Sequence, residues 1–269
     1  VQYQGVIPMR LGEMTWQEVN SLDRRTAVLV PFGALEQHGA HLPLETDALI
    51  AESLSRRLDE SCEGRLLVLP TQWLGLSTHH MAFAGTVSAS VDTYLALAAE
   101  IIGSIAQAGF GKILVLNSHG GNASALDVVL TKLRLLHPAT RIVLVTYWNI
   151  AAQQLGVIRQ SKLGGMGHAC ELETSLVLAE KPQLVRTDRL QADGKWPASR
   201  FLASDMLAGG PATVSRAFTE ISTEGAVGDP RTASSEKGQQ FFDAIVAQLR
   251  DLVNELAWGK LEDFRAAGT

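Results

Sequence analysis

The chain is poor in cysteine, in long apolar runs and in excess positive charge, and each shortage excludes a class of protein. Two cysteines, Cys62 and Cys170, among 269 residues cannot form a disulfide framework, so we expect a protein of the reducing cytoplasm. No apolar stretch is long enough to cross a bilayer, and the N-terminus carries no signal-peptide pattern. The net charge of -5 offers no surplus of cations, so neither nucleic acid nor a membrane is an expected partner.

The motifs that hold nucleotides and activated serines are also absent from the sequence. Neither G-x-G-x-x-G nor G-x-x-x-x-G-K-[ST] occurs, and there is no G-x-S-x-G elbow. Cys170 lies two residues from His168, and Ser118 is next to His119. Residues so close along a backbone rarely form a working nucleophile–base pair. We therefore interpret Cys170 as a small packed thiol.

Apolar runs and helical spacing alternate along the chain. Four short runs, at 27–32, 66–69, 112–117 and 141–146, are apolar throughout, as is typical of central strands covered on both faces. Helical spacing occurs between them at 47–58, 91–108 and 122–136, and again at 171–179 and 239–258, whereas 181–234 is typical of loops. This order predicts an α/β fold with a mainly parallel sheet. Without a repeat or a convincing linker, we expect a single domain over residues 1–269.

The loop after the first predicted strand is the most informative stretch of the chain. It places Glu36, His38, His41 and Asp47 within twelve residues. Imidazole nitrogen and carboxylate oxygen are the ligands that divalent transition metals prefer. Asp47 begins a predicted helix, so it could cap that helix, bridge two metals, or do both with its two oxygens.

Other polar side chains follow the remaining predicted strands. His119 follows the 112–117 strand, Tyr147 and Trp148 follow the 141–146 strand, and His80 lies in the loop after the 66–69 strand. Because the carboxyl ends of parallel strands meet at one edge of the sheet, these residues are expected to converge there with Glu36. Two glycines after His119 predict a turn and leave room for a metal or a substrate.

Two glutamates begin the predicted 171–179 helix. Glu171 and Glu173 are two residues apart and cannot share a helix face, so one could face the site while the other caps the helix or interacts with its dipole. His168 lies just before them and titrates in the range that proton transfer requires.

Several blocks of the sequence resemble the signature blocks of the creatininase (creatinine amidohydrolase) family. They are residues 31–39, 41–43, 46–47, 117–122 and 168–175, with weaker support from 12–16 and 225–238, so the resemblance covers nearly the whole chain. It implies a three-layer α/β/α sandwich with a central, mainly parallel sheet. It also implies two divalent metal ions (zinc, manganese or iron), hydrolysis of a C–N bond in a cyclic or linear amide, and a homo-oligomer, often a hexamer.

The resemblance assigns roles to individual residues. Glu36, Asp47 and His119 would hold one metal, and His38 with the bridging Asp47 and a further carboxylate would hold the other. Creatininase itself has a metal-binding glutamate where this chain has Gly121, and another glutamate where it has Gly167. The chain is in this respect more similar to the subgroup of formylaminopyrimidine deformylases and the mycofactocin-precursor peptidase.

In that subgroup the missing carboxylate comes from a His-Ala-Gly-Glu block, which predicts Glu171 as the remaining metal ligand. The Tyr147-Trp148 pair matches a Tyr-Trp pair whose tryptophan lines the substrate site.

These observations predict a metal-dependent amidohydrolase that acts on a small molecule through a metal-bound hydroxide. His168 and Glu171 are the predicted catalytic residues, and His80, Tyr147 and Trp148 the predicted substrate-binding residues. A binuclear lactonase or ring hydrolase is an alternative, because the same ions could cleave other bonds. A non-catalytic α/β protein that binds a metal or a small molecule is a second alternative.

Overall fold

Five parallel strands form the centre of the molecule. The computed structural model describes residues 9–197, 199–203 and 205–257. Its sheet has the order β1-β3-β2-β4-β5, formed by β1 (Met9–Arg10), β2 (Ala27–Phe32), β3 (Leu66–Val68), β4 (Lys112–Asn117) and β5 (Arg141–Thr146). Every neighbouring pair is parallel. The predicted parallel sheet is therefore confirmed, and the two-residue strand β1 is the strand that the sequence did not predict.

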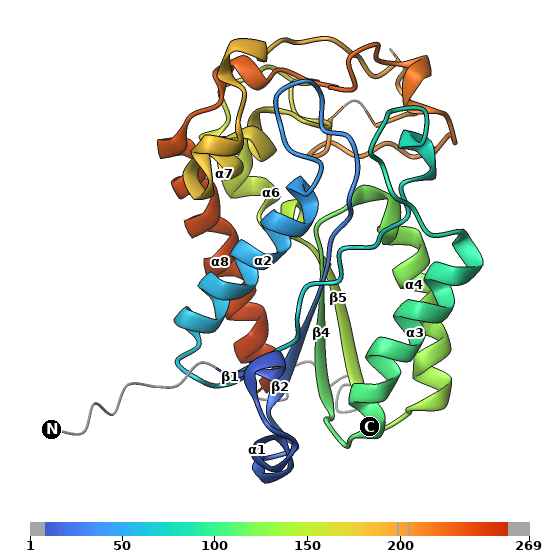
Figure 1. Cartoon of the computed structure of the whole chain (residues 1–269), viewed down its shortest axis with the longest axis vertical. Coiled ribbons are helices and arrows are strands. Elements are labelled where there is room, and N and C mark those ends of the chain that lie inside the picture. Colours follow the sequence, from blue (N-terminus) through green and yellow to red (C-terminus); the bar gives the residue numbers. More distant parts are fainter. Residues whose placement is uncertain (1–8, 198, 204, 258–269) are drawn as a thin grey trace, which may run out of the picture.

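Helices cover both faces of the sheet (Figure 1). One layer contains α2 (Thr46–Ser61), α6 (Ala152–Ile158), α7 (Glu171–Glu180) and α8 (Ser235–Ala257), and the other contains α3 (Val91–Gln107) and α4 (Ala123–Leu136). Successive side chains of β2 alternate between these layers: Leu29 packs with the α2 and α8 side chains, whereas Val28 and Val30 pack with those of α3 and α4. Because both faces are covered, all six residues of β2 are buried. The three-layer α/β/α architecture is confirmed.

The register of the sheet brings the carboxyl ends of the central strands level with one another. Phe32 at the end of β2 pairs with Asn117 at the end of β4, and Asn117 pairs with Thr146 at the end of β5. The residues that follow these strands therefore emerge at the same edge of the sheet. The short helix α5 (Tyr147–Ile150) begins directly after β5.

Two helices pack closely beneath that edge. Gly238 in α8 lies against α7, where a side chain at this position would collide with the backbone carbonyl of Ser175. Helix α8 begins at Ser235, one turn before the predicted start, and the predicted last residue, Trp258, lies outside the described residues.

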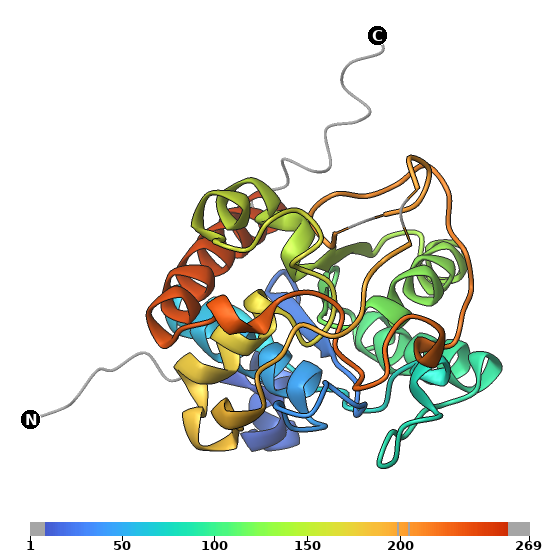
Figure 2. The ribbon, with the colours of Figure 1, turned by 90° about the horizontal axis from the view of Figure 1, so that it is seen from above.

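The predicted loop region 181–234 contains short turns and isolated bridges, and it lies over the carboxyl edge of the sheet (Figure 2). Within the described residues, no helix combines the length and the apolar character that a membrane crossing requires.

Candidate metal centre

The end of β2 and the start of α2 are held together by close backbone packing. A side chain at Gly33 would collide with the backbone of Ala48 in α2, so only glycine allows this approach. The hydroxyl of Ser118, just after β4, donates to the carbonyl of Asp47 at 2.7 Å and lies 3.0 Å from the carbonyl oxygen of Phe32. Three segments that are distant in sequence therefore meet at one point.

A first group of ligand-type side chains surrounds His119. Its Nδ1 atom lies 3.1 Å from Oδ2 of Asp47 and 3.3 Å from Oε1 of Glu36. The imidazole of His79 stacks on that of His119 with ring centroids 5.7 Å apart, and His79, Glu36 and His119 offer ligand atoms within 4.8 Å of one another. Apart from its neighbour His80, no sequence pattern predicted that His79 would lie here.

A second group surrounds His38. Its Nε2 atom lies 3.3 Å from Oδ1 of Asp47 and 3.9 Å from Oε1 of Glu173. The two oxygens of Asp47 thus face two histidines from different loops. This is the arrangement that a carboxylate shared between two ions requires.

Both histidines have one ring nitrogen held by a backbone carbonyl. The carbonyl of Glu36 lies 3.2 Å from Nδ1 of His38, and that of Leu76 lies 3.0 Å from Nε2 of His119. A carbonyl can only accept, so these nitrogens carry the protons and the opposite nitrogens face the carboxylates as free ligands.

The buried polar atoms of the centre fit a cation. Among the described residues, both carboxylate oxygens of Glu36, Nε2 of His38 and Oδ2 of Asp47 are buried without a hydrogen-bond partner. Burying charged groups without partners costs several kcal/mol unless a metal or counterion compensates. A set of imidazoles and carboxylates suits zinc, manganese or iron, so the residues present fit the implied metal.

Electrostatics within the cluster agree with this arrangement. Although burial opposes a charged ring, the Asp47 carboxylate raises the pKa of His38 to about 9. Despite its own burial, Asp47 has a pKa below the ordinary value because His38 and His119 stabilise its charge. For Glu173 burial dominates and raises the pKa to about 7. The metal-free centre therefore holds protons that a bound cation would displace.

Glu171 does not reach this cluster. Its carboxylate pairs with Lys237 of α8 at 2.6 Å and accepts the backbone N–H groups of Gln160 and Ser161, each at 2.8 Å. Burial would raise the pKa of Glu171, but these partners lower it. The structure thus corrects the expectation that Glu171 is the remaining ligand, because a buried lysine on another helix already neutralises it.

Glu173 occupies the position that we expected Glu171 to fill. Its Oε1 atom faces His38, while its Oε2 atom accepts the N–H of Cys170 (3.3 Å) at the start of α7. Glu173 therefore caps the start of α7 and faces the cluster at the same time. The Cys170 thiol is fully buried, and burial raises its pKa, which agrees with a packed and inert thiol.

Two further histidines lie beside Glu36. Nε2 of His168 donates to the carbonyl of Gln37 (2.7 Å), and its Nδ1 atom lies 3.7 Å from Oε1 of Glu36. Nε2 of His80 lies 3.3 Å from the same oxygen, and its Nδ1 accepts from the Gln37 amide at 2.6 Å. Burial, with the charge of His38, lowers the pKa of His168 to about 3, so its ring is neutral at pH 7.

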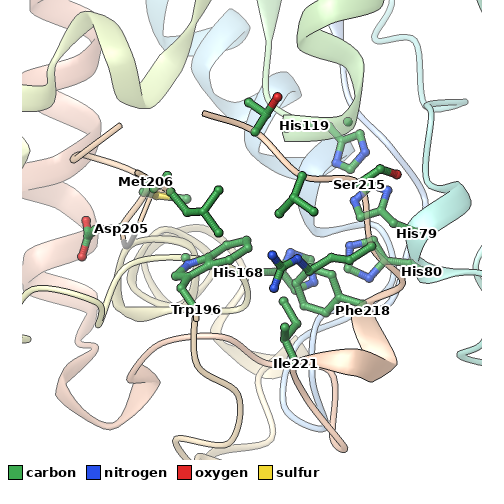
Figure 3. Close-up of a pocket in the computed structure, with 18 of the residues that line it drawn as sticks. His79, His80, His119, His168, Trp196, Asp205, Met206, Ser215, Phe218 and Ile221 are labelled. Atoms are coloured by element: carbon green, nitrogen blue, oxygen red, sulfur yellow. The ribbon is translucent and has the colours of Figure 1, made fainter. Parts of the chain in front are cut away.

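A cavity of about 680 Å³ opens above these histidines. Figure 3 shows Trp196, Met206, Phe218 and Ile221 around it, all from the 181–234 loops. The Phe218 ring lies 4.1 Å from His80 and 4.8 Å from His168, centroid to centroid. No periodic pattern in the sequence predicted these cavity residues. Their large apolar side chains in otherwise polar loops were the one signal that could have identified them.

The two predicted aromatic contacts differ in their surroundings. Trp148 lines the cavity, and its contact with substrate stays a prediction. Tyr147 is fully buried in the core and packs edge-on against Trp148, with ring centroids 4.9 Å apart. Its predicted contact with substrate is not supported by this position, because the ring supports Trp148 from behind.

Comparison with known proteins reveals relatives along almost the whole chain. The sequence model of the family described as creatinine amidohydrolase (Creatininase) matches residues 12–253. The chain is 33% identical over 252 residues to the mycofactocin precursor peptide peptidase of Mycobacterium ulcerans, covering 91% of both chains. It is 27% identical over 264 residues to the creatinine amidohydrolase of Pseudomonas putida, covering 91% of this chain and 96% of that enzyme.

Solved structures agree with these sequence relationships. A crystal structure of creatinine amidohydrolase superimposes with a TM-score of 0.72 at 27% identity, covering 92% of this chain and 97% of that one. Two further creatininase structures at 26% identity, a Zn-Zn type and a manganese form, superimpose with TM-scores of 0.73 and 0.72.

Proposed function

The chain belongs to the creatininase family of amide-cleaving hydrolases, and on that premise we propose that it binds two divalent metal ions at Asp47 and hydrolyses an amide of a small molecule or peptide. Glu36, Asp47 and His119 would hold one ion, with His79 as a further donor. His38, Asp47 and Glu173 would hold the other. When bound, the ions would polarise an amide carbonyl and lower the pKa of a water molecule to about 7.

One observation carries this proposal. The two oxygens of Asp47 face separate histidines at 3.1 and 3.3 Å, and each histidine presents a nitrogen that no backbone group occupies. A structural aspartate in the first turn of a helix would instead accept backbone N–H groups, whereas the Asp47 carboxylate faces His38 and His119.

We assign His168 to orienting the substrate rather than to donating a proton. Its Nε2 proton is committed to the Gln37 carbonyl, so the neutral ring offers only the Nδ1 lone pair as an acceptor. An N–H group of an amide substrate is a suitable donor to that atom. His80, which contacts the same glutamine and Glu36, would hold the Glu36 carboxylate in place.

The cavity walls would supply the binding energy and exclude water. Trp148, Trp196 and Phe218 bring large apolar surfaces next to the cluster. A cavity of about 680 Å³ has room for a group larger than a single small ring. The proposed substrates are therefore formamides, cyclic amides or short peptides with an apolar portion.

By the same family relationship, we propose a homo-oligomer, with a hexamer as the specific expectation. The proposed compartment is the cytoplasm, where the two buried free cysteines would stay reduced. We treat residues 1–269 as one domain, since both hydrophobic cores pack on the same sheet.

Two substitutions test the proposal. His38→Ala and Asp47→Ala should each lose metal, measured by elemental analysis, and amide hydrolysis, while circular dichroism shows an unchanged fold. His137→Ala removes a histidine at the end of α4, away from the cluster, and should change neither quantity. If both site variants keep the wild-type metal content, the assignment is wrong.

A further inference from the structure

We propose that Arg216 binds a carboxylate of the substrate, so that the enzyme prefers amides that combine an apolar body with an anionic group. This role rests on the proposed function, because it concerns the cavity above the same metal centre. It names the substrate class more narrowly than the metal ligands do.

Arg216 turns inward from an exposed loop. It lies two residues before the short turn Phe218–Glu220, and its neighbours Ser215 and Ala217 are exposed. Arg216 itself is partly buried, and it lines the cavity together with Ser215, Phe218 and Ile221. Its partial burial therefore distinguishes Arg216 from an arginine that is fully exposed to solvent.

The acidic side chains of the cavity are already committed to other partners. Glu36, Asp47 and Glu173 form the metal cluster, where two divalent ions would outweigh their three negative charges. Asp205 accepts from both terminal nitrogens of Arg159, at 2.9 and 3.0 Å, and from the N–H of Gly164 at 2.8 Å. No carboxylate of the cavity is left for Arg216.

Arg216 is thus a cation without a counterion in the part of the chain that the structure describes. It is the single lysine or arginine among the described cavity-lining residues, and no ion pair or side-chain hydrogen bond involves its guanidinium there. A partly buried guanidinium beside apolar walls gains most from a carboxylate, which it can bind through two parallel hydrogen bonds.

The surroundings favour a carboxylate over a phosphate as the anionic group. A doubly charged phosphate is usually held by several cations or backbone N–H groups, whereas a single guanidinium matches a single carboxylate. The apolar walls formed by Trp148, Trp196 and Met206 would accommodate the hydrocarbon part of the same molecule.

A matched pair of ligands tests this role. N-formyl-L-leucine and N-formyl-L-leucinamide share the formamide and the side chain but differ in the carboxylate. Isothermal titration calorimetry on the wild type should show binding of the acid about tenfold or more tighter than binding of the amide. Arg216→Gln should remove this difference, and Arg216→Lys should retain part of it because the charge remains but the planar fork is lost.

The control variant is Arg200→Gln. Arg200 is exposed on the same group of loops, stacks over Phe201 at 4.5 Å and does not line the cavity, so its loss should leave the preference unchanged. The titrations are made on metal-loaded and metal-free protein, because a carboxylate can also bind to the metal ions.

Three results would overturn the role of Arg216. They are equal binding of the two ligands to the wild type, a preference that survives in Arg216→Gln, or no binding of the acid up to about 10 mM. Hydrolysis of the two formamides by the metal-loaded enzyme is scored separately. Arg216-dependent binding without hydrolysis would count against formamide cleavage alone, whereas hydrolysis without a charge preference would count against Arg216 alone.

Discussion

Each histidine that faces Asp47 uses one nitrogen to fix its orientation and presents the other to the carboxylates. His38 donates from Nδ1 to the Glu36 carbonyl, and His119 donates from Nε2 to the Leu76 carbonyl. Such backbone partners fix the tautomer and the ring angle before a metal arrives. The ring orientations are therefore preorganised, and the remaining obstacle to metal binding is the protons on His38 and His119, whose pKa values are raised, despite their burial, by the buried carboxylates.

These protons predict how metal affinity depends on pH. In the metal-free protein the pKa of His38 is raised to about 9, so a metal must displace a proton at pH 7 and at pH 8. Affinity for zinc should rise by at least about tenfold per pH unit from pH 7 to 9, because His119, whose pKa is raised despite its burial by Glu36 and Asp47, must release a proton as well. Below pH 7, protonation of Glu173, whose pKa is about 7, should make the dependence steeper. Competition titrations against a chelator of known affinity measure this slope, and a flat profile would contradict the assignment of His38 as a ligand.

The sequence predicts most of the cluster of ligand-type side chains but not its last carboxylate. Glu36, His38, Asp47 and His119 were identified because ligand-type residues followed predicted strands, and the sheet register does bring those strand ends together. The choice between Glu171 and Glu173 depends on Lys237, a residue of a different helix. No local pattern around residue 171 contains that information.

At the level of elements, the long strands and helices were predictable because each repeats its pattern several times. The helices α2, α3, α4, α7 and α8 and the strands β2 to β5 begin and end within a few residues of the predicted limits. The two-residue β1 and the short α1 (Trp16–Ser21), α5 and α6 contain too few periods to be recognised. The loops that form the cavity have no periodicity at all, which is why Trp196 and Phe218 were missed.

The buried pair between α7 and α8 predicts a stability effect that is separate from metal binding. Lys237→Met leaves the fully buried Glu171 carboxylate without its cation and should lower the free energy of unfolding by about 3 kcal/mol or more. Denaturant unfolding of the metal-free protein measures this loss. Lys132→Met, at an exposed position of α4, is the control and should change stability by less than about 0.5 kcal/mol.

The effect of Lys237→Met should also depend on pH in a defined direction. The native pKa of Glu171 lies below its ordinary 4.5, so the stabilisation is present above that pH and is lost as the pH falls through the lower native value. The gap between wild type and Lys237→Met should therefore narrow on acidification. A variant as stable as the wild type at pH 7 would show that the pair does not support the two helices.

At the scale of the whole molecule, the layered fold and the loops have different roles. The sheet and its two helix layers bring ligand-type side chains that follow β2 and β4 or begin α2 and α7 to one edge, while the 181–234 loops cover that edge and line the cavity. The chain shares this fold with creatininase along nearly its full length. Differences in substrate between relatives are therefore expected to arise in the covering loops, where Trp196, Arg216 and Phe218 lie, rather than in the metal cluster.

Two metal ions at Asp47, with Glu173 as a ligand, are tested by the number of ions per chain in three proteins. After purification, loading with zinc and dialysis, elemental analysis should give two ions in the wild type, one in Glu173→Gln and two in Glu171→Gln. The last two variants make the same chemical change two residues apart, so they separate a lost ligand from a general disturbance of α7. The proposed pair of metal sites is wrong if Glu171→Gln loses an ion while Glu173→Gln keeps both, or if the wild type holds fewer than two.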